Sequence, residues 1–145
     1  MIDTLYLIAT IAGTRVAFRS SQVDSVVVVN AVTPVPHAPR HIAGLFALRS
    51  RVMTLVDARA VIGSDTAVGR DGDKAIVVDI GGHQYGILAD SIEDACFIES
   101  DELPMRGRLA TGWKTIADAM IEHDGRTLLV VDPGKLVTPP LAKAA

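Results

Sequence analysis

Two short stretches, IAGTRVAF at residues 11–18 and IGGHQYGI at residues 80–87, decide the fold of this chain. In each stretch an apolar strand ends, the chain turns at a glycine and a second apolar strand begins, which is the pattern of a β-hairpin. Matching residues are 69 positions apart, as Gly13 and Gly82 are, and the match continues into an apolar pair after each hairpin. The sequence therefore predicts an internal duplication of a small β unit. Chance similarity is the competing interpretation, because strand–glycine–strand patterns are common.

The closing residues of each unit support the duplication. Leu55-Val56-Asp57 matches Val130-Val131-Asp132 at a separation of 75 positions, and each aspartate precedes a short predicted helical turn, at residues 58–62 and 133–137. Aspartate is favoured at helix N-termini, because its carboxylate accepts hydrogen bonds from free backbone N–H groups. We therefore interpret Asp57 and Asp132 as helix caps, in preference to a pair of catalytic carboxylates.

The composition excludes several classes of protein. The chain has 145 residues, of which 49% are apolar and 21% charged, and its net charge is −3. It is too apolar to be disordered, and its pI near 5.7 argues against a nucleic-acid-binding protein. Its apolar runs are shorter than the roughly 18 residues of a membrane-spanning helix, and the acidic Asp3 disfavours a signal peptide. We therefore expect a cytoplasmic protein that neither binds nucleic acid nor inserts into a membrane.

Short segments rich in valine and isoleucine predict a mainly β fold. Each half has about five predicted strands, and a unit of this size tends to close into a barrel, which removes its exposed edges. Two packed barrels would share a third apolar layer between them. We expect one domain over residues 1–145, with units at approximately 13–72 and 73–137 and the N-terminal strand free to cross over. Residues 138–145, which contain two prolines, are expected to form a flexible tail.

A search for catalytic or metal-binding chemistry finds little. His37 and His41 have the spacing of two metal ligands on a helix, but Pro39 between them opposes a helix. The single cysteine, Cys96, lies in an apolar strand, so we interpret it as a small buried hydrophobic residue rather than a nucleophile. We therefore predict no catalytic residue, no metal site and no cofactor.

The most unusual stretch is AGLFALRSR at residues 43–51, which places two arginines at a turn between strands. Arg49 and Arg51 project to the same side if the backbone is extended. Arginine is enriched at protein interfaces, because its planar head forms paired hydrogen bonds and stacks on other groups. An ordinary charged turn is the alternative interpretation.

This stretch and its surroundings resemble the CheW-like domain of the chemotaxis coupling protein family. The family's pattern is a proline-rich link followed by two motifs, Gly-apolar-x-Asn-Leu-Arg-Gly and apolar-Pro-apolar-apolar-Asp-Leu-Arg. Here the pattern reads PVPHAP at 34–39, IAGLFALRS at 42–50 and VMTLVDAR at 52–59, and YGILADSI at 85–92 is similar to a further motif in the family's second half. The resemblance covers roughly residues 3–137. It implies two five-stranded SH3-like β-barrels packed together, with short helical turns.

The chain departs from the family's pattern at four positions. Ala47, Ser50 and Thr54 stand where the family commonly has Asn, Gly and Pro. Ser25 stands where an acidic residue is frequent, although Asp24 is adjacent. A partner that reads those groups would meet altered chemistry, which is compatible with a specialised paralogue that serves another chemosensory pathway.

The resemblance implies a non-enzymatic adaptor in two-component signalling, which couples the cytoplasmic helical tips of chemoreceptors to the regulatory domain of the histidine kinase CheA. It also implies recruitment to membrane-associated receptor arrays and association with other CheW-like domains in rings. Carried over by motif position, the candidate kinase-binding residues are Val23, Ser25, Val27, Gly44 and Leu45. The candidate receptor-binding residues, expected along the groove between the barrels, are Arg49, Ala75, Gly86, Ile92 and Ala95.

Structural alternatives accompany these assignments. Gly86 and Ala95 are small enough to let their strands curve, and Val27 can face the core. Two alternative functions also stay open at this point. One is a CheW-like scaffold of a pathway other than chemotaxis, and the other is a small-molecule-binding or hydrolytic β-barrel protein, which would need a convergent polar site.

Overall fold

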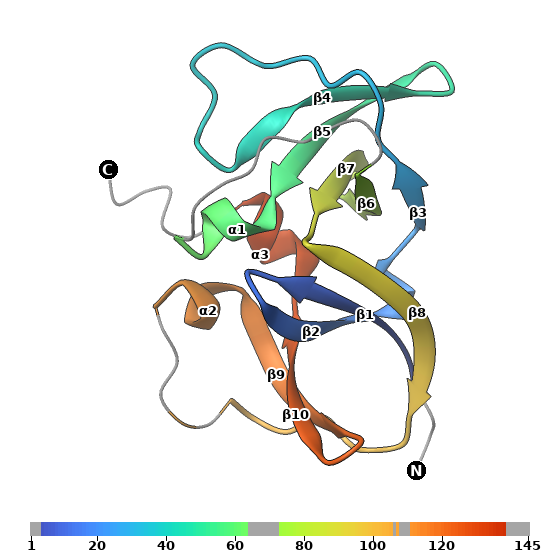
Figure 1. Cartoon of the computed structure of the whole chain (residues 1–145), viewed down its shortest axis with the longest axis vertical. Coiled ribbons are helices and arrows are strands. Elements are labelled where there is room, and N and C mark those ends of the chain that lie inside the picture. Colours follow the sequence, from blue (N-terminus) through green and yellow to red (C-terminus); the bar gives the residue numbers. More distant parts are fainter. Residues whose placement is uncertain (1–3, 64–72, 106, 108–110, 139–145) are drawn as a thin grey trace.

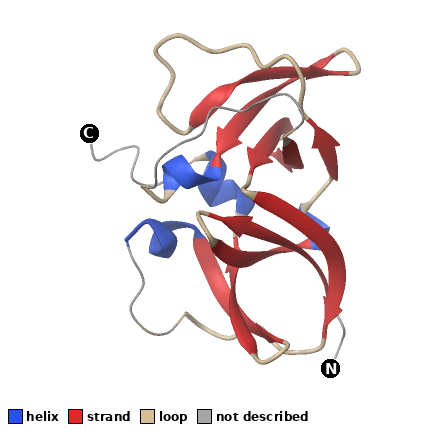
Figure 2. Cartoon of the chain, viewed as in Figure 1, coloured by secondary structure: helices blue, strands red, loops and turns tan. Residues whose placement is uncertain are grey.

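The computed structural model describes residues 4–63, 73–105, 107 and 111–138. Within these residues two five-stranded sheets lie one above the other (Figure 1), and Figure 2 shows the short helices near the middle of the molecule. Sheet A, in the order β8-β1-β2-β10-β9, contains β1 (Thr4–Ile11), β2 (Thr14–Arg19), β8 (Ser91–Ile98), β9 (Ala117–His123) and β10 (Arg126–Val131). Sheet B, in the order β3-β6-β7-β5-β4, contains β3 (Ser25–Val28), β4 (Ile42–Leu48), β5 (Arg51–Asp57), β6 (Lys74–Ile80) and β7 (His83–Leu88). The helices are η1 (Ser20–Gln22), α1 (Ala58–Val61), α2 (Thr111–Ile116) and α3 (Pro133–Val137).

The core has three apolar layers, as the sequence predicts for two packed units. The interior of the sheet A unit holds a cluster that includes Tyr6 and Val130, and the interior of the sheet B unit holds one that includes Phe46. The largest cluster lies between the sheets and takes side chains from both, among them Phe18 and Ile87. Each sheet therefore buries side chains on both of its faces, which accounts for the high apolar content of the chain.

The strand pairing supports the duplication and shows that the two halves exchange strands. In sequence order, β1 to β5 with α1 correspond to β6 to β10 with α3. Sheet A combines the β1–β2 hairpin of the first half with β8, β9 and β10 of the second, and sheet B combines the β6–β7 hairpin with β3, β4 and β5. Even the parallel pairs are equivalent, because Val16 pairs with Leu129 in sheet A and Tyr85 pairs with Thr54 in sheet B.

The division into two units differs from the expected one. Sheet B is continuous in sequence over residues 25–88, whereas sheet A joins residues 4–19 to residues 91–131. The boundary expected between 72 and 73 therefore falls inside sheet B, and the whole β1–β2 hairpin crosses over, not its first strand alone. A hairpin signal is local, and it does not specify which strands flank the hairpin in a sheet. Of the tail expected at 138–145, only Thr138 lies within the described residues.

The strand pairing leaves both sheets open rather than closed into complete barrels. β8 and β9 are the edges of sheet A, and β3 and β4 are the edges of sheet B. In each unit, one isolated antiparallel bridge connects the segment after one edge strand to the other edge strand. Leu103, after β8, pairs with Met120 of β9, and Thr33, after β3, pairs with Leu45 of β4. Because a single bridge covers only a small part of an edge, the described structure leaves the rest of each edge strand available to a partner.

The four hairpins share one kind of turn. Each has two central residues with positive φ, which is the type I′ geometry whose twist matches that of antiparallel strands. Three of these turns have glycine at the second position, but the β4–β5 turn is Arg49-Ser50, with φ of 52° and 65°. The predicted helix caps are confirmed, since the Asp57 and Asp132 carboxylates each accept a hydrogen bond of 3.0 Å from the backbone N–H two residues later.

Candidate protein-binding surfaces

Two of the candidate receptor-binding residues lie in the interior of the sheet B unit. Ala75 is fully buried. A Cβ on Gly86 would lie 3.3 Å from the Ala75 Cβ and 2.8 Å from a Leu55 methyl carbon. The absence of a larger side chain at these positions is therefore required by packing within sheet B, and neither residue offers a surface to a partner. For Gly86 the structural alternative raised from the sequence is the better interpretation.

The other three candidate receptor-binding residues are accessible but lie apart. Arg49 is exposed at the β4–β5 turn, at the upper end of sheet B in Figure 1. Ile92 and Ala95 lie on β8, which starts beyond the opposite end of sheet B, because β5 and β7 run parallel from the turn towards β8. A six-residue strand such as β7 spans about 20 Å. The five candidates therefore do not form one groove.

The candidate kinase-binding residues divide in a similar way. Gly44 is buried, and a Cβ there would lie 2.6 Å from a backbone oxygen of the segment after β3, so glycine is needed for the two segments to pair. Val27 packs against the interior cluster of sheet B, and Val23 packs against the cluster between the sheets. Ser25 is exposed and Leu45 is half-buried, which leaves these two accessible to a partner.

Sequence reasoning missed the apolar side chains that the structure exposes. Among the described residues, six large apolar side chains are exposed, and four of them are Val26, Val28, Val52 and Phe97. The alternation along β3 places Val26 and Val28 on the face opposite to Val27. The run of valines at 26–29 shows no alternation of apolar and polar residues, so the sequence did not show which face of the strand would be covered.

Exposed apolar side chains of β3 and β8 lie on the same faces of their sheets as the buried side chains that pack between the sheets. Val26 pairs with Ile76, and Ala95 pairs with Leu7, and directly paired residues share a face of the sheet. Ile76 and Leu7 both belong to the cluster between the sheets. Both strands lie on the right-hand side of Figure 1. We define the β3–β8 margin as the exposed part of these two faces, Val26, Val28, Ala95 and Phe97, together with Ile92, which is half-buried at its border with the layer between the sheets.

A second uncovered area lies next to the β4–β5 turn. Val52, Thr54 and Val56 alternate onto one face of β5, and Val56 is buried between the sheets. The residues that pair with Val52 and Thr54 share this face and are exposed or half-buried. We define the β5 ledge by these residues together with the two arginines at its end: Leu45, Ala47, Arg49, Arg51, Val52, Thr54 and Tyr85.

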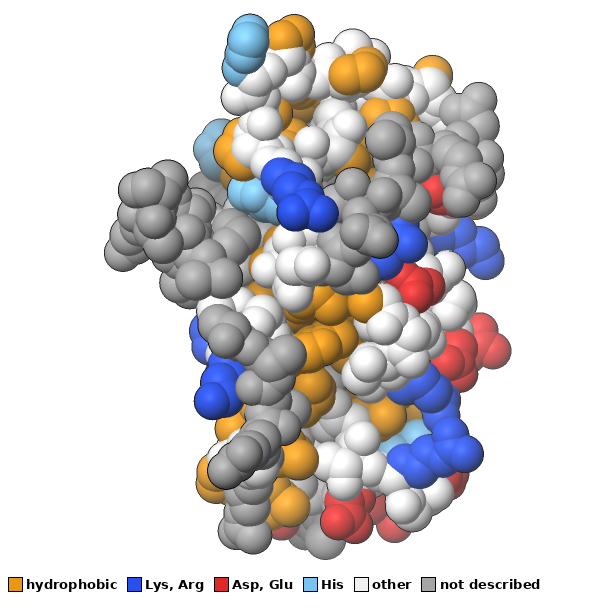
Figure 3. All heavy atoms as spheres, turned by 60° about the vertical axis from the view of Figure 1, so that its left-hand side comes forward, with side chains coloured by type: hydrophobic (Ala, Val, Ile, Leu, Met, Phe, Trp, Pro, Cys, Tyr) orange, Lys and Arg blue, Asp and Glu red, His pale blue; other side chains and the backbone are white. Residues whose placement is uncertain are grey.

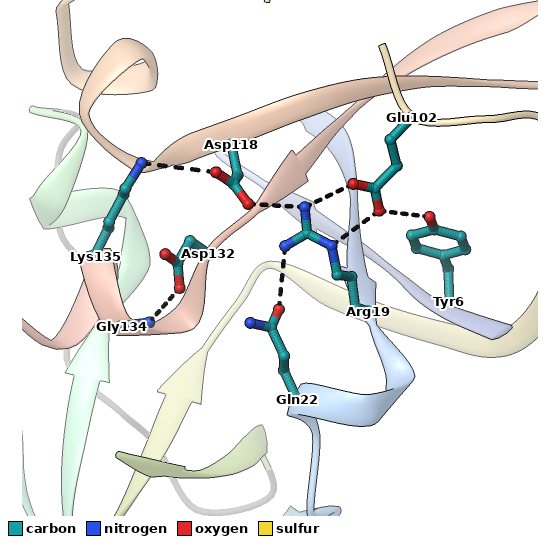
Figure 4. Close-up of polar contacts among 8 residues, drawn as sticks. All are labelled: Tyr6, Arg19, Gln22, Glu102, Asp118, Asp132, Gly134 and Lys135. Atoms are coloured by element: carbon teal, nitrogen blue, oxygen red, sulfur yellow. Dashed lines mark hydrogen bonds and ion pairs between the residues drawn. The ribbon is translucent and has the colours of Figure 1, made fainter. Parts of the chain in front are cut away.

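Charged side chains fix the segment after β8 and helix α3 against sheet A (Figure 4). Arg19 donates hydrogen bonds of 2.7 and 2.9 Å to Glu102 and forms an ion pair of 2.7 Å with Asp118, which lies 3.9 Å from the Lys135 ammonium. The Tyr6 hydroxyl donates to Glu102 at 2.6 Å. Burial, together with this hydrogen bond, raises the pKa of Tyr6 to about 12, and the bonds from Arg19 hold the pKa of Glu102 below its usual value. This cluster supports the fold and its charges are already paired.

A second polar cluster joins the two sheets. Asp90, between β7 and β8, accepts hydrogen bonds of 3.1 and 2.9 Å from the backbone N–H groups of Ala12 and Gly13 in the β1–β2 turn. The Arg59 guanidinium lies 3.6 Å from Asp90 and 3.7 Å from Asp57, the cap of α1. Asp90 therefore holds a turn of sheet A beside α1, the helix that follows β5 of sheet B.

The described residues show no arrangement suited to metal or nucleophilic chemistry. They contain no group of three or more His, Cys, Asp or Glu side chains that could hold a metal ion. Cys96 Sγ lies 3.8 Å from His123 Nε2, but burial raises the pKa of the Cys96 thiol, which disfavours the reactive thiolate. None of the described helices has the length and apolar character needed to span a bilayer. What the described surface offers is apolar area and charge, which suit protein binding.

Comparison with known proteins agrees with this description. A family model described as the CheW-like domain matches residues 5–139. The chemotaxis protein CheW of Rhizobium meliloti (strain 1021) is 26% identical over 101 residues, which is 69% of this chain and 65%, just under two thirds, of that relative. The crystal structure of the scaffolding protein TtCheW from Thermoanaerobacter tengcongensis has a TM-score of 0.79 at 18% identity, covering 96% of this chain and 95% of that one, so the fold is shared. Because the family model covers nearly the whole chain and the fold agrees, this chain belongs to the CheW-like domain family.

Proposed function

We propose that this chain is a non-enzymatic adaptor that couples the helical tips of chemoreceptors to the histidine kinase CheA, at receptor arrays in the cytoplasm. One observation carries the proposal: apolar side chains are exposed on faces that form the core elsewhere in the same sheets. Groups of exposed apolar side chains on such faces are compatible with protein interaction sites. Membership of the CheW-like domain family supports the choice of these two partners.

The receptor tip is assigned to the β5 ledge, which also contains Leu45, a residue that motif position assigns to the kinase. A helix packs on a sheet through small and apolar side chains, and the ledge offers Ala47 and Val52, of which Val52 is 66% exposed. Arg49 and Arg51 stand at its end, where a guanidinium can form paired hydrogen bonds with a carboxylate of the partner. Ile92 and Ala95 of the β3–β8 margin form a second receptor strip in this proposal, and Ala95→Glu tests it separately from Arg49.

The kinase regulatory domain is assigned to β3. Among the described residues β3 pairs with β6 alone, so its other edge is free to meet a second sheet. Ser25, Val26 and Val28 are exposed on this short, uncharged strand. The β5 ledge and β3 lie at different parts of sheet B, and two separate surfaces are what an adaptor needs in order to hold two partners at once.

The decisive experiment measures binding of the full chain to each partner by isothermal titration calorimetry. The partners are the CheA regulatory domain and a receptor cytoplasmic hairpin from the same host. Arg49→Glu should weaken receptor binding about thirtyfold, the effect of losing a central interface contact, and leave kinase binding unchanged. Val28→Glu should do the reverse. Neither variant should change the melting temperature appreciably, because both side chains are exposed.

Two matched controls separate a specific contact from a general effect of charge. Arg126→Glu makes the same charge reversal beside the equivalent β9–β10 turn of sheet A, and Val35→Glu places a carboxylate on another exposed valine. If each control weakens binding as much as its partner variant, the proposed surfaces are wrong. If the unmodified chain binds neither partner, the adaptor function itself is wrong.

The pathway is decided by which partners bind. A chain that binds the kinase and receptors of another chemosensory system, and not those of chemotaxis, would be a CheW-like scaffold of that system, and the departures at Ala47, Ser50 and Thr54 lie in the part of the chain concerned. A small-molecule-binding protein is less well supported, because the larger surface hollows among the described residues are broad and open rather than enclosed.

A further inference from the structure

The edge strands β3 and β8 hold equivalent positions in the two sheets but differ in chemistry. β8 pairs with β1 along one side, and among the described residues no strand pairs with its other side. Asp24 and Ser25 at the start of β3 correspond to Glu93 and Asp94 of β8. β3 itself is a serine and three valines preceded by one carboxylate, Asp24, whereas β8 carries two carboxylates within the strand.

Two neighbouring hollows adjoin β8, and the first also extends over β1 and β2. One, of about 540 Å³, is lined by Ile8, Arg15 and the residues of β8 from Ile92 to Cys96. The other, of about 340 Å³, lies at the end of β8 and extends to the tip of the β9–β10 hairpin. His123 lines both, so the two form one open trough along the strand. We call this surface the β8 trough.

The hollow at the end of β8 combines an exposed aromatic ring with carboxylates. Phe97 is 67% exposed. Glu99, Glu122 and Asp124 line the same hollow, and among the described residues only Asp124 has an ion-pair partner, His123 at 3.4 Å. Figure 3 shows acidic side chains at the lower end and along the right-hand side of the molecule, with basic side chains beside them.

The other hollow, along Ile92 to Cys96, is lined by one arginine, and that arginine is already paired. The Arg15 guanidinium, which lines it, donates hydrogen bonds of 3.2 and 3.0 Å to the two carboxylate oxygens of Glu93 and is held by that residue. Asp94 is exposed beside them. The carboxylates that line the trough outnumber its positive side chains, Arg15 and the neighbouring Arg126 across from His123, so the trough attracts a cation and would repel a second acidic edge.

We propose that the β8 trough binds an extended, lysine- or arginine-bearing segment of a partner protein. The backbone of the segment adds to the free edge of β8, as in other strand-addition complexes. One cationic side chain lies over the ring of Phe97 and between Glu99, Glu122 and Asp124, where an aromatic face and carboxylates attract it together. This inference goes beyond the adaptor function, because its ligand is neither the kinase nor the receptor. The trough shares Ile92 and Ala95 with the proposed second receptor strip, so the two occupants would compete there.

The test uses the full chain and two synthetic peptides that alternate valine with lysine or valine with glutamate. Binding is followed by amide chemical shifts at low ionic strength. The lysine peptide should bind and shift the amides of residues 94–98, and its affinity should fall with added salt, because the charges are exposed. The glutamate peptide should not bind. Equal binding of both peptides, or no binding of the lysine peptide, would overturn the proposal.

Three variants locate the binding. Glu122→Lys should weaken binding of the lysine peptide about tenfold, since it reverses a charge within the site, and Phe97→Ala should weaken it about threefold, through loss of the cation–π contact. Asp24→Lys is the matched control, because it makes the same charge change at the start of the equivalent β3 and should weaken binding by less than about twofold. If Asp24→Lys weakens binding as much as Glu122→Lys, the attraction is one of net charge alone and the site is wrong.

Discussion

Ser50 and Gly125 occupy the same position in two equivalent hairpin turns. Both are the second central residue of a type I′ turn, with φ of 65° and 74°, and they are 75 positions apart, the separation between the two closing hairpins. Glycine adopts this left-handed conformation without steric cost, whereas any residue with a Cβ does not. Ser50 therefore holds its turn at a cost that its equivalent avoids, at the tip of the surface assigned to the receptor.

Ser50→Gly should stabilise the protein by about 1 kcal/mol, because it removes the Cβ from a left-handed residue. The melting temperature should rise by about 4 °C, as expected for a domain of this size. Gly125→Ser is the mirror experiment and should lower stability by a similar amount. Scanning calorimetry of the two variants would show opposite shifts, and shifts of the same sign would contradict the equivalence of the turns.

Gly44→Ala and Gly86→Ala should both destabilise the protein, but to different extents. The new Cβ at Gly44 would meet a backbone oxygen at 2.6 Å with φ at +153°, and backbone cannot easily move, so we expect a loss of about 3 kcal/mol. The new Cβ at Gly86 would meet the movable side chain of Leu55, so about 1–2 kcal/mol is expected.

Gly134→Ala is the control for these glycine variants, because its added Cβ would make only an ordinary contact of 3.4 Å with Asp132. Its stability should change by less than about 0.5 kcal/mol in urea unfolding. Gly86→Ala should leave the receptor affinity of the folded fraction unchanged. If Gly86→Ala greatly lowered the affinity for the receptor without lowering stability, Gly86 would be a contact residue of the receptor rather than a packing residue of sheet B.

Protonation of the Glu102 carboxylate should lower the stability of the protein in acid. Hydrogen bonds from Arg19 lower its pKa below the ordinary value of 4.5, so the folded state holds the ionised form more tightly than the unfolded state does. The resulting stabilisation is present above pH 4.5 and is lost as the pH falls through the lowered pKa. Urea unfolding at several pH values should show a smaller loss on acidification for Glu102→Gln than for the unmodified chain, and equal losses would contradict the assignment.

Asp57→Ala should cost more stability than Asp132→Ala. Each substitution removes a helix cap worth about 1 kcal/mol, but Asp57 also lies 3.7 Å from Arg59, which contacts Asp90. A double-mutant cycle between Asp57→Ala and Asp90→Ala, followed by thermal unfolding, should therefore show coupling. Asp132→Ala with Asp90→Ala is the matched cycle and should be additive; coupling of the same size in both cycles would contradict the proposed connection through Arg59.

Most of the local structure could be predicted from the sequence. The glycine turns, the β-branched runs and the two capping aspartates each depend on neighbouring residues, and the structure places strands, turns and caps where these signals indicate. The helix α2 was missed, because residues 99–114 show only a mixed, turn-rich pattern. Its burial against the layer between the sheets, through Trp113, is a tertiary contact.

The candidate binding residues could be predicted only in part. The turn with two arginines that the residues predicted is present and exposed, and Arg49 lies there, but it does not lie along a groove between the units as the family motifs implied. They did not distinguish Ala75 and Gly86, which are buried inside sheet B, from residues of the surface. Period-two alternation separates the two faces of a strand, but it cannot say which face is covered when both faces of the sheet take part in packing.

By itself, the sequence determined the β class, the hairpins, the caps and the duplication, because each of these follows from short-range patterns and from their recurrence along the chain. Only the tertiary structure decided that each hairpin inserts into the sheet of the other half, since the two halves carry nearly equivalent strands and local patterns fit either partner. The tertiary structure also decided which apolar side chains remain outside the shared layer. That depends on how far one sheet overlaps the other, and Val26, Val28, Val52 and Phe97 are exposed because they lie beyond the overlap.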